Sequence, residues 1–174
     1  MKEQIKMKEN NVMREIKIEK LILSIGAVKN ELEKACKLLQ KITGRKPIIR
    51  KSKRRIPGFD VRPGLEVGCM VTIRKKEIIP LLKKLFKAGE NKIKRKQICD
   101  NFFSFGIPEY IEIPGMEYDR EIGIIGLDVS VVFSRKGKRV KIKKIKRGKF
   151  PRKQDVTKEE IIKFLEEELQ IKAS

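Results

Sequence analysis

Histidine is absent from this 174-residue chain, and acidic residues are scarce: 23 Asp and Glu stand against 44 Lys and Arg. Without histidine, the commonest general base of enzymes is missing. The three cysteines, Cys36, Cys69 and Cys99, are odd in number and far apart. They argue against a disulfide framework and favour an intracellular chain. Because no pair of possible ligands has zinc-site spacing, we expect no metal and no other cofactor.

Long hydrophobic runs are also missing. No stretch approaches the roughly 18 apolar residues that a membrane-spanning helix needs, and the N-terminus has no apolar segment of a secretory signal. The phosphate-binding motif GxxxxGK[ST] and the hydrolase motif GxSxG do not occur. Asp60, Asp119 and Asp128 are separated, and Asp128 is more readily interpreted as a satisfied strand-edge residue than as a catalytic carboxylate. We therefore predict that the protein is not an enzyme.

What the chain has in excess is positive charge, with a formal net charge of +21. Such an excess destabilises a compact state by self-repulsion unless a polyanion neutralises it, and nucleic acid is the usual polyanion. The first cluster contains Arg45, Lys46, Arg50, Lys51, Lys53, Arg54, Arg55 and Arg62. The second has no acidic residue and contains Lys136, Lys138, Arg139, Lys141, Lys143, Lys144, Lys146, Arg147, Lys149, Arg152 and Lys153. A solvated charge run is a weak explanation for the second cluster, which favours phosphate contacts.

Hydrophobic periodicity predicts alternating strands and helices. We expect long strands over 13–26, 65–74 and 124–134, and a short one over 47–51. Amphipathic helices are expected over 31–43, closed by a cap glycine at Gly44, and over 77–88. A third helix follows the capping box formed by Thr157 and Glu160. Residues 102–106 are expected to form a short edge strand or an extended turn, and residues 139–146 a hairpin strand or a basic arm.

This order predicts an α+β fold, in which an antiparallel or mixed sheet carries helices packed on one face. The other face is left free and is a plausible RNA platform. We expect a flexible basic tail over 1–12 and a single domain over 13–174, with a basic loop at 51–64 and a basic arm at 136–153. The alternation of Ile142 and Ile145 with lysines suggests that one side of the arm packs while the other faces phosphate.

Aromatic residues are few, and most are expected in the core. Phe59 is the exception, because it lies in a basic loop rich in proline and glycine, RRIPGFDVRPG. An exposed aromatic ring there suits stacking on an RNA base. The aromatic pattern of RRM domains and the GxxG loop of KH domains do not occur, so composition alone does not identify the target.

Several stretches, taken in order, resemble one family. They are IEKLILSIG at 18–26, TGRKP at 43–47, KSKRRIPGFDVRPG at 51–64, VGCMVTIR at 67–74, NFFSFGI at 101–107, YDREIGIIGLDV at 118–129 and TKEEIIKFL at 157–165. As a set they resemble the universal ribosomal protein five of the large subunit. The basic segment 136–153 is similar to that of the archaeal and eukaryotic branch.

The resemblance implies a structural RNA-binding protein of the cytoplasmic ribosome. It implies binding to 5S rRNA and large-subunit rRNA in the central protuberance, through a concave sheet face. It also implies that the loop at 51–64 approaches the P-site tRNA, and that neighbouring proteins of the protuberance and the small-subunit head are partners.

The predicted RNA-binding residues combine positions that match the family's motifs with cations of the two clusters. They are Ser24, Gly26, Thr43, Gly44, Arg45, Lys46, Arg50, Lys51, Thr72, Arg74, Ser104, Gly106, Lys138, Arg139, Lys141, Lys143, Lys144, Lys146 and Arg147. The predicted tRNA-facing residues are Lys53, Arg54, Arg55, Phe59 and Arg62. Ser24 and Arg45 depart from the family's usual Asn and Gln, and Gly26, Gly44 and Gly106 also suit turn or cap geometry.

Two alternatives remain open. A stand-alone basic regulator of DNA or RNA would need a recognition helix with exposed Arg or Asn, whereas the predicted helices are amphipathic and directed to the core. An enzyme that acts on RNA would have to modify or cleave it.

Overall fold

A computed structural model describes residues 11–74, 77–89, 92–169 and 172–173. Residues 1–10 of the predicted basic tail lie outside the described residues. The chain forms two compact units, the first from 1–20, 92–103 and 131–174, and the second from 21–91 and 104–130. Strands β1, β6 and β7 contribute residues to both units, which are described one at a time below. The predicted single domain over 13–174 stays a prediction.

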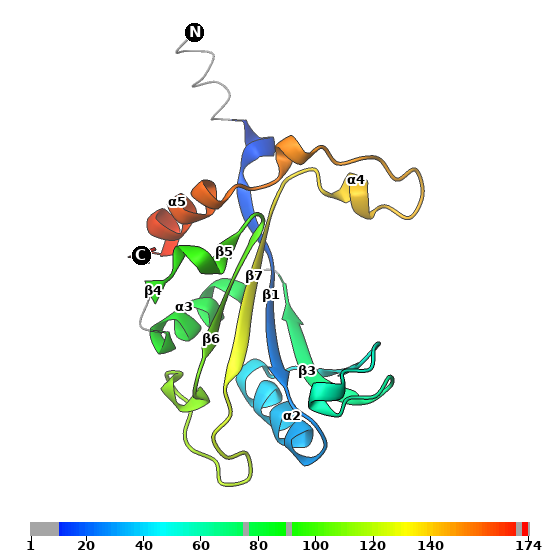
Figure 1. The fold of residues 1–174 in the computed structure, drawn as a ribbon. Helices are drawn as coiled ribbons and strands as arrows, with labels where there is room; N and C mark the ends of the chain where they lie inside the picture. Colours follow the sequence, from blue (N-terminus) through cyan, green and yellow to red (C-terminus); the bar gives the residue numbers. More distant parts are fainter. Residues whose placement is uncertain (1–10, 75–76, 90–91, 170–171, 174) are drawn as a thin grey trace. The chain divides into compact units, whose positions relative to one another are not determined.

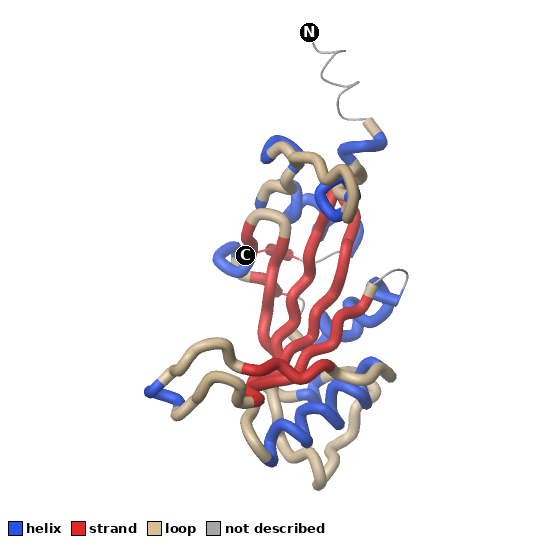
Figure 2. The backbone as a smooth tube through the Cα atoms, turned by 90° about the vertical axis from the view of Figure 1, so that its right-hand side faces the viewer, coloured by secondary structure: helices blue, strands red, loops and turns tan. Residues whose placement is uncertain are grey.

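The main sheet has six strands, drawn red in Figure 2. Their order is β2 (Ile48–Lys51), β3 (Glu66–Ile73), β1 (Ile16–Gly26), β7 (Leu127–Arg135), β6 (Phe102–Ile107) and β5 (Ile98–Cys99). The pairs β2–β3, β1–β3 and β5–β6 are antiparallel. Two short strands, β4 (Lys92–Ile93) and β8 (Lys172–Ala173), pair in parallel. The predicted α+β class is confirmed. Strand β6 lies between β7 and β5, but β5 pairs with it only at Phe102 and Phe103, so the edge-strand prediction is wrong only for the start of β6.

Burial alternates along β7 and along the second half of β1, as a sheet with one covered face requires. In β7, Leu127, Val129, Val131, Phe133 and Arg135 are buried, while the residues between them are exposed or half-buried. In β1 the buried residues are Leu21, Leu23 and Ile25. The alternation predicted from the sequence is therefore a real division into a covered and an outward face.

In the second unit, helices α2 (Asn30–Thr43) and α3 (Ile78–Ala88) bury their apolar stripes. Helix α2 lies alongside β3 (Figure 1). Helix α3 stacks Phe86 on Phe105 of β6, with ring centroids 4.9 Å apart. Pro80 lies in the first turn of α3, where its missing N–H costs nothing. Both helices contact buried positions of the strands, which leaves the outward positions of this unit uncovered by them.

In the first unit, helix α5 (Lys158–Leu169) packs through Phe164 against Phe133, whose ring also contacts Phe103. One of the two hydrogen bonds of the capping box predicted at Thr157 is present, since the Thr157 amide donates to Glu160 Oε2 at 3.1 Å. Single 3-10 turns occur in both units. In the first unit they are Val12–Arg14, Arg95–Gln97 and Arg152–Gln154, and in the second Pro57–Phe59 and Tyr110–Glu112.

The segment after β7 differs from one of its two predicted forms. It is not a hairpin strand: Arg139–Ile142 forms a four-residue helix, α4, followed by bends. Glycine at 148 and proline at 151 favour such an irregular path over a longer helix. Ile142 and Ile145 are 63% and 78% exposed, so the prediction that one side of the arm packs is wrong.

Cys69 is buried in β3 and Cys36 is half-buried on α2. Burial, with a smaller contribution from Cys36, raises the pKa of the Cys69 thiol to about 12. Among the described residues, no helix is both long and apolar enough to cross a membrane. The same residues contain no cluster of three potential metal ligands drawn from His, Cys, Asp and Glu.

Candidate nucleic-acid interface

The outward face of the sheet gathers several predicted RNA-binding residues in the second unit. Antiparallel pairing sets Ile22 opposite Thr72, Ser24 opposite Met70, and Gly26 opposite Gly68. Arg50 of β2 is also opposite Gly68. Because directly paired residues point to the same side of a sheet, Ser24, Thr72 and Arg50 share one face. The side chains of Ser24 and Thr72 are half-buried and that of Arg50 is exposed.

Strand β6 adds Ser104 and Gly106 to this face. They alternate with the buried Phe103, Phe105 and Ile107. A Cβ placed on Gly106 would lie 3.5 Å from Oδ1 of Asp128, which is an exposed residue of β7. Short side chains and bare backbone thus form much of this surface.

Gly26 and Gly106 have no internal reason to be glycine. Neither has a positive φ, and an added Cβ would meet nothing within 4 Å at Gly26 and only ordinary contact at Gly106. Gly68 and Gly126 differ, because a Cβ there would lie 2.7 Å from a backbone oxygen. The turn or cap explanation therefore does not apply to Gly26 and Gly106, and close approach by a ligand remains as a reason for bare backbone.

The C-terminus of α2 shows the opposite case. Gly44 adopts φ +64° and its amide donates to the Gln40 carbonyl at 2.8 Å, which is the predicted cap. The Thr43 hydroxyl donates to the Leu39 carbonyl at 2.7 Å and accepts from the Arg45 amide at 3.3 Å. The Arg45 guanidinium forms an ion pair with Glu77. These three predicted residues thus have structural partners, whereas Lys46 is exposed without a partner in the described part of the chain.

The basic loop at 51–64 is an ordered extension of the β2–β3 hairpin. The Ser52 amide donates to the Leu65 carbonyl at 2.8 Å, and the Gly64 amide to the Ser52 carbonyl at 2.8 Å. Further out, Ile56 and Val61 form an antiparallel bridge, and Val61 is only 6% exposed. The 3-10 turn at 57–59 then presents Phe59, which is 81% exposed, as expected.

The cations of this loop face solvent. Lys53, Arg54, Arg55 and Arg62 are exposed, and none of them forms an ion pair within the described ranges. Lys51 at the base of the loop lies 3.5 Å from Glu66, in an exposed pair that contributes little to stability. Arg74, which directly follows β3, is exposed as well.

The basic arm at 136–153 belongs to the first unit and is held at its start. Lys136 Nζ lies 2.6 Å from Glu15, and Lys138 forms an ion pair with Glu19 of β1. Glu15 and Glu19 thus supply carboxylates to the arm, which has no acidic residue of its own. The hydrogen bond from Lys136 holds the pKa of the Glu15 carboxyl below its usual value.

Beyond these pairs the arm is open. Its exposed cations have no carboxylate partner among the residues that the structure describes; they are Arg139, Lys141, Lys143, Lys144, Lys146, Arg147, Lys149, Arg152 and Lys153. Local bonds fold the segment back, since the Gly148 amide donates to the Val140 carbonyl at 3.2 Å and Arg147 Nε to the Lys143 carbonyl at 3.3 Å.

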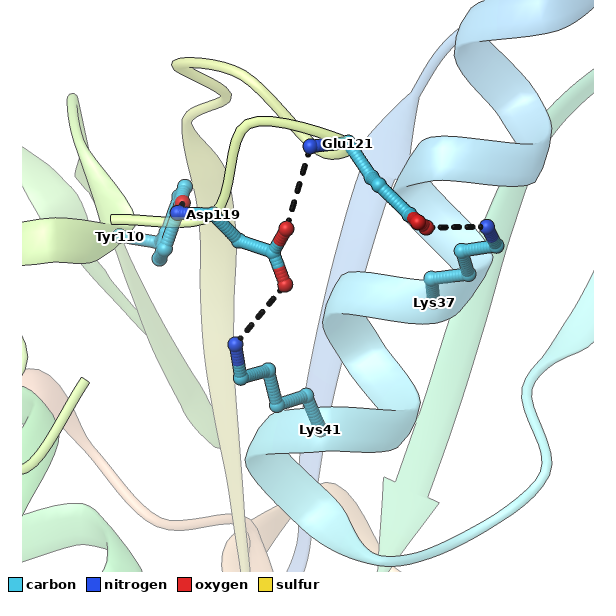
Figure 3. Close-up of polar contacts among 5 residues, drawn as sticks. All are labelled: Lys37, Lys41, Tyr110, Asp119 and Glu121. Carbon is cyan, nitrogen blue, oxygen red and sulfur yellow. Dashed lines mark hydrogen bonds and ion pairs between the residues drawn. The ribbon is translucent and has the colours of Figure 1, made fainter. Parts of the chain in front are cut away.

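Two lysines that the sequence reasoning passed over fix another part of the second unit. Lys37 and Lys41, one turn apart on α2, bind Glu121 at 2.9 Å and Asp119 at 3.0 Å (Figure 3). The Asp119 carboxylate also accepts from the Glu121 amide, and its own amide donates to the Tyr110 hydroxyl at 2.9 Å. This network ties the 108–126 segment to α2. In the sequence, the only indication of this network was that two lysines lie four residues apart beside the apolar face of the predicted helix.

The network shifts two titrations. Hydrogen bonds from Lys41 and from the Glu121 amide hold the pKa of Asp119 below its usual value. The hydrogen bond to Glu121, reinforced by its charge, raises the pKa of Lys37. Both shifts favour the charged forms, so both ion pairs are present throughout the neutral range, although as exposed pairs they contribute little to stability.

Asp128 does not fit its sequence interpretation. It lies in β7, between β1 and β6, and is therefore not at a strand edge. Its carboxylate is exposed and has no hydrogen-bond or ion-pair partner among the described residues. It is thus a solvent-exposed acidic group without a protein partner in the described part of the chain.

Comparison with known proteins gives a consistent result along the chain. The model of the family "Ribosomal protein L5" matches residues 11–62, and the model of the C-terminus of the same ribosomal family matches residues 66–164. The large ribosomal subunit protein uL5 of Nanoarchaeum equitans is 47% identical over 160 residues, covering 90% of this chain and 95% of that protein. The uL5 proteins of Picrophilus torridus and Sulfolobus acidocaldarius are each 39% identical, covering 93% and 94% of this chain and 94% of each protein.

Proposed function

The chain belongs to the L5 family of large-subunit ribosomal proteins, and from this premise we propose that it binds 5S rRNA in the central protuberance. Membership makes it a structural, non-enzymatic constituent of the large subunit, a partner of rRNA and ribosomal proteins in the ribosome of the cytoplasm. The likeness to archaeal relatives agrees with the branch expected from the basic segment at 136–153. The 5S target, the P-site tRNA and the small-subunit head are proposals.

The observation that carries the 5S rRNA proposal is the outward sheet face of the second unit. Ser24, Thr72 and Ser104 offer short hydrogen-bonding groups, and Gly26 and Gly106 leave backbone bare without a structural need. Arg50 adds an exposed cation on the same face. Hydrogen-bonding groups for sugar and base edges and a cation for phosphate suit the recognition of structured RNA, and the apolar Ile22 and Met70 lie beside them on the same face.

The test is competitive filter binding of the full chain to 5S rRNA, with tRNA as competitor at 150 mM salt. We expect a clear preference for 5S rRNA, because hydrogen bonds on the sheet face add to the unspecific attraction of phosphate. Equal affinity for the two RNAs would contradict the proposal.

The loop at 51–64 supports a second part of the proposal, contact with the P-site tRNA. Backbone bonds hold the loop in one form, and its cations and Phe59 are exposed without internal partners in the described part of the chain. Neutralising Lys53, Arg54, Arg55 and Arg62 to glutamine should weaken crosslinking of the assembled subunit to tRNA and leave the melting temperature of the free protein nearly unchanged. A loss of thermal stability as large as that of a core substitution would contradict this assignment.

Contact with other proteins of the protuberance and with the small-subunit head rests on the family's place in the ribosome. Crosslinking of assembled ribosomes with mass-spectrometric identification tests it. Crosslinks from this chain to small-subunit proteins are expected, and crosslinks confined to rRNA would remove that part of the proposal.

A further inference from the structure

A pocket of about 790 Å³ opens in the second unit, where β1 ends, β6 ends and β7 begins. Ser24 and Gly26 line it from β1, Gly106 from β6, and Asp128 from β7. Pro108, Ile124 and Ile125 supply an apolar wall from the segment that Lys37 and Lys41 tie to α2. The pocket therefore lies among residues of the proposed RNA-binding face.

Two carboxylates line this pocket, Glu31 from α2 and Asp128 from β7, and only Asp128 lies on the sheet. Its carboxylate is exposed and has no partner in the described residues, although the chain carries a net charge of +21. A side chain longer than hydrogen at position 106 would lie against Asp128 Oδ1, because even a Cβ there would be 3.5 Å away. Gly106, which has no positive φ, thus leaves the carboxylate uncovered.

A carboxylate on an RNA-binding face can bind the hydrogen-bond donors of the bases but not the phosphates. It repels phosphate, and it accepts hydrogen bonds but donates none. The hydrogen-bond donors of RNA bases are amino and imino groups on the base edges. Guanine presents two of them side by side, N1–H and the N2 amino group, and together they match the two oxygens of a carboxylate.

We propose that Asp128 recognises an unpaired guanine that enters this pocket, by accepting hydrogen bonds from its N1 and N2 groups. The inference rests on the proposed binding of 5S rRNA and names a residue that determines its specificity. The bare backbone of Gly26 and Gly106 gives the base room, and the apolar wall of Pro108, Ile124 and Ile125 packs against its ring.

The decisive variant is Asp128→Asn, which keeps the shape and removes the negative charge and one acceptor. Affinity of the full chain for 5S rRNA should fall by about 5- to 150-fold, the range of a bidentate contact to a base. Affinity for tRNA should stay constant or rise, because a repulsive charge is gone. If both affinities rise together, Asp128 only repels phosphate and the proposal is overturned.

Glu33→Gln is the matched control. It removes one exposed carboxylate from α2, away from the pocket, and should leave the ratio of the two affinities unchanged. Gly106→Ala should lower 5S rRNA affinity by covering Oδ1, and the double variant with Asp128→Asn should lose little more than either alone. Additive losses would show two separate contacts and count against the assignment.

The RNA side gives an independent readout. Kethoxal modifies N1 and N2 of unpaired guanines, and the wild-type chain should protect at least one guanine of 5S rRNA that Asp128→Asn leaves reactive. Inosine at that position, which lacks the N2 amino group, should weaken binding of the wild type but not of Asp128→Asn. No difference in protection between the wild type and Asp128→Asn would overturn the proposal.

These outcomes are distinguishable from failure of the proposed function itself. If the wild-type chain shows no preference for 5S rRNA over tRNA, the proposed function fails. If the preference is present and survives Asp128→Asn unchanged, only the assignment of Asp128 fails.

Discussion

The loop at 51–64 and the arm at 136–153 are both strongly basic, yet they are held in different ways. The loop extends a β-hairpin, and its order comes from backbone hydrogen bonds at Ser52 and Gly64 and from the Ile56–Val61 bridge. The arm is held at its start by ion pairs of Lys136 and Lys138 with Glu15 and Glu19. Like charge in the sequence therefore does not mean like order in the structure.

The difference has a physical consequence for each region. Backbone bonds and a buried Val61 are insensitive to salt, whereas exposed ion pairs weaken as salt rises. The loop should keep one form in the free protein, so that it presents Phe59 without reordering. The arm should adjust to its polyanion, because its exposed isoleucines and cations have little internal packing.

The largest effect should follow from removing the open charges of the arm. Replacing Lys141, Lys143, Lys144, Lys146 and Arg147 by glutamine should lower rRNA affinity by at least about 100-fold at 150 mM salt. The slope of log affinity against log salt should become shallower by roughly 3 to 4. Filter binding over a salt series measures both, and an unchanged slope would show that the arm does not contact phosphate.

The next largest effect concerns Arg135, the last residue of β7, which directly precedes the arm. Arg135 is buried, and both oxygens of Glu160 lie 2.6 Å from its Nη2. Glu160→Gln leaves that cation without its counter-charge and should lower the free energy of unfolding by about 3 kcal/mol. This is the low end for breaking a buried pair, because the Glu160 side chain is about a third exposed and screened by solvent. Chemical denaturation measures the loss, with the exposed Glu159→Gln as control.

The same pair predicts a pH dependence. Burial raises the pKa of Glu160, but the hydrogen bonds from Arg135 and the Thr157 amide outweigh it, and the net pKa is lowered. A lowered carboxyl pKa stabilises the folded state above the unfolded-state pKa of about 4.3, and this stability is lost as pH falls through the folded-state pKa. Glu160→Gln should therefore lose less stability than wild type between about pH 5 and 3. An equal loss in both would contradict the assignment.

A single exposed ring in the loop and a matched apolar side chain in the arm sharpen the comparison further. Phe59→Ala in the loop should weaken binding of tRNA to the assembled subunit by about 5- to 150-fold, if the ring stacks on one base. Ile145→Ala in the arm, at nearly the same exposure, removes no stacking surface and should change it less than twofold. Neither variant should shift the melting temperature. If the two variants weakened tRNA binding equally, the prediction that Phe59 stacks on a tRNA base would be wrong.

The smallest effect concerns the start of the arm. Combining Glu15→Gln with Glu19→Gln should leave the melting temperature nearly unchanged and speed proteolysis within 136–153 a few-fold, with no change in the loop. Because the hydrogen bond from Lys136 lowers the pKa of Glu15, this pair is intact at neutral pH and is lost only as pH falls through that lowered pKa. Limited proteolysis at pH 7 with and without 0.5 M salt tests this. Cleavage that increases in the loop instead would reverse the comparison.

Much of the fold could be predicted from the sequence. Helix α2 and strands β1 and β3 are long periodic segments, and Gly44 and Pro80 take the backbone positions expected of a cap and a first turn. The errors fell where the pattern is short or mixed. The alternating Ile142 and Ile145 suggested packing, yet no described element covers them, and the glycine at 148 folds the segment back on Val140 instead.

For the interface, the sequence determined which residues carry charge, which are small, and that the chain belongs among RNA-binding proteins, because composition and motif order are properties of the chain itself. Only the tertiary structure decided which of them share a surface. Register set Ser24, Thr72 and Arg50 on one face, distance gave Lys136 and Lys138 their carboxylates, and Gly106 left Asp128 uncovered. Pairing across a sheet depends on strand order and register, which local periodicity does not encode.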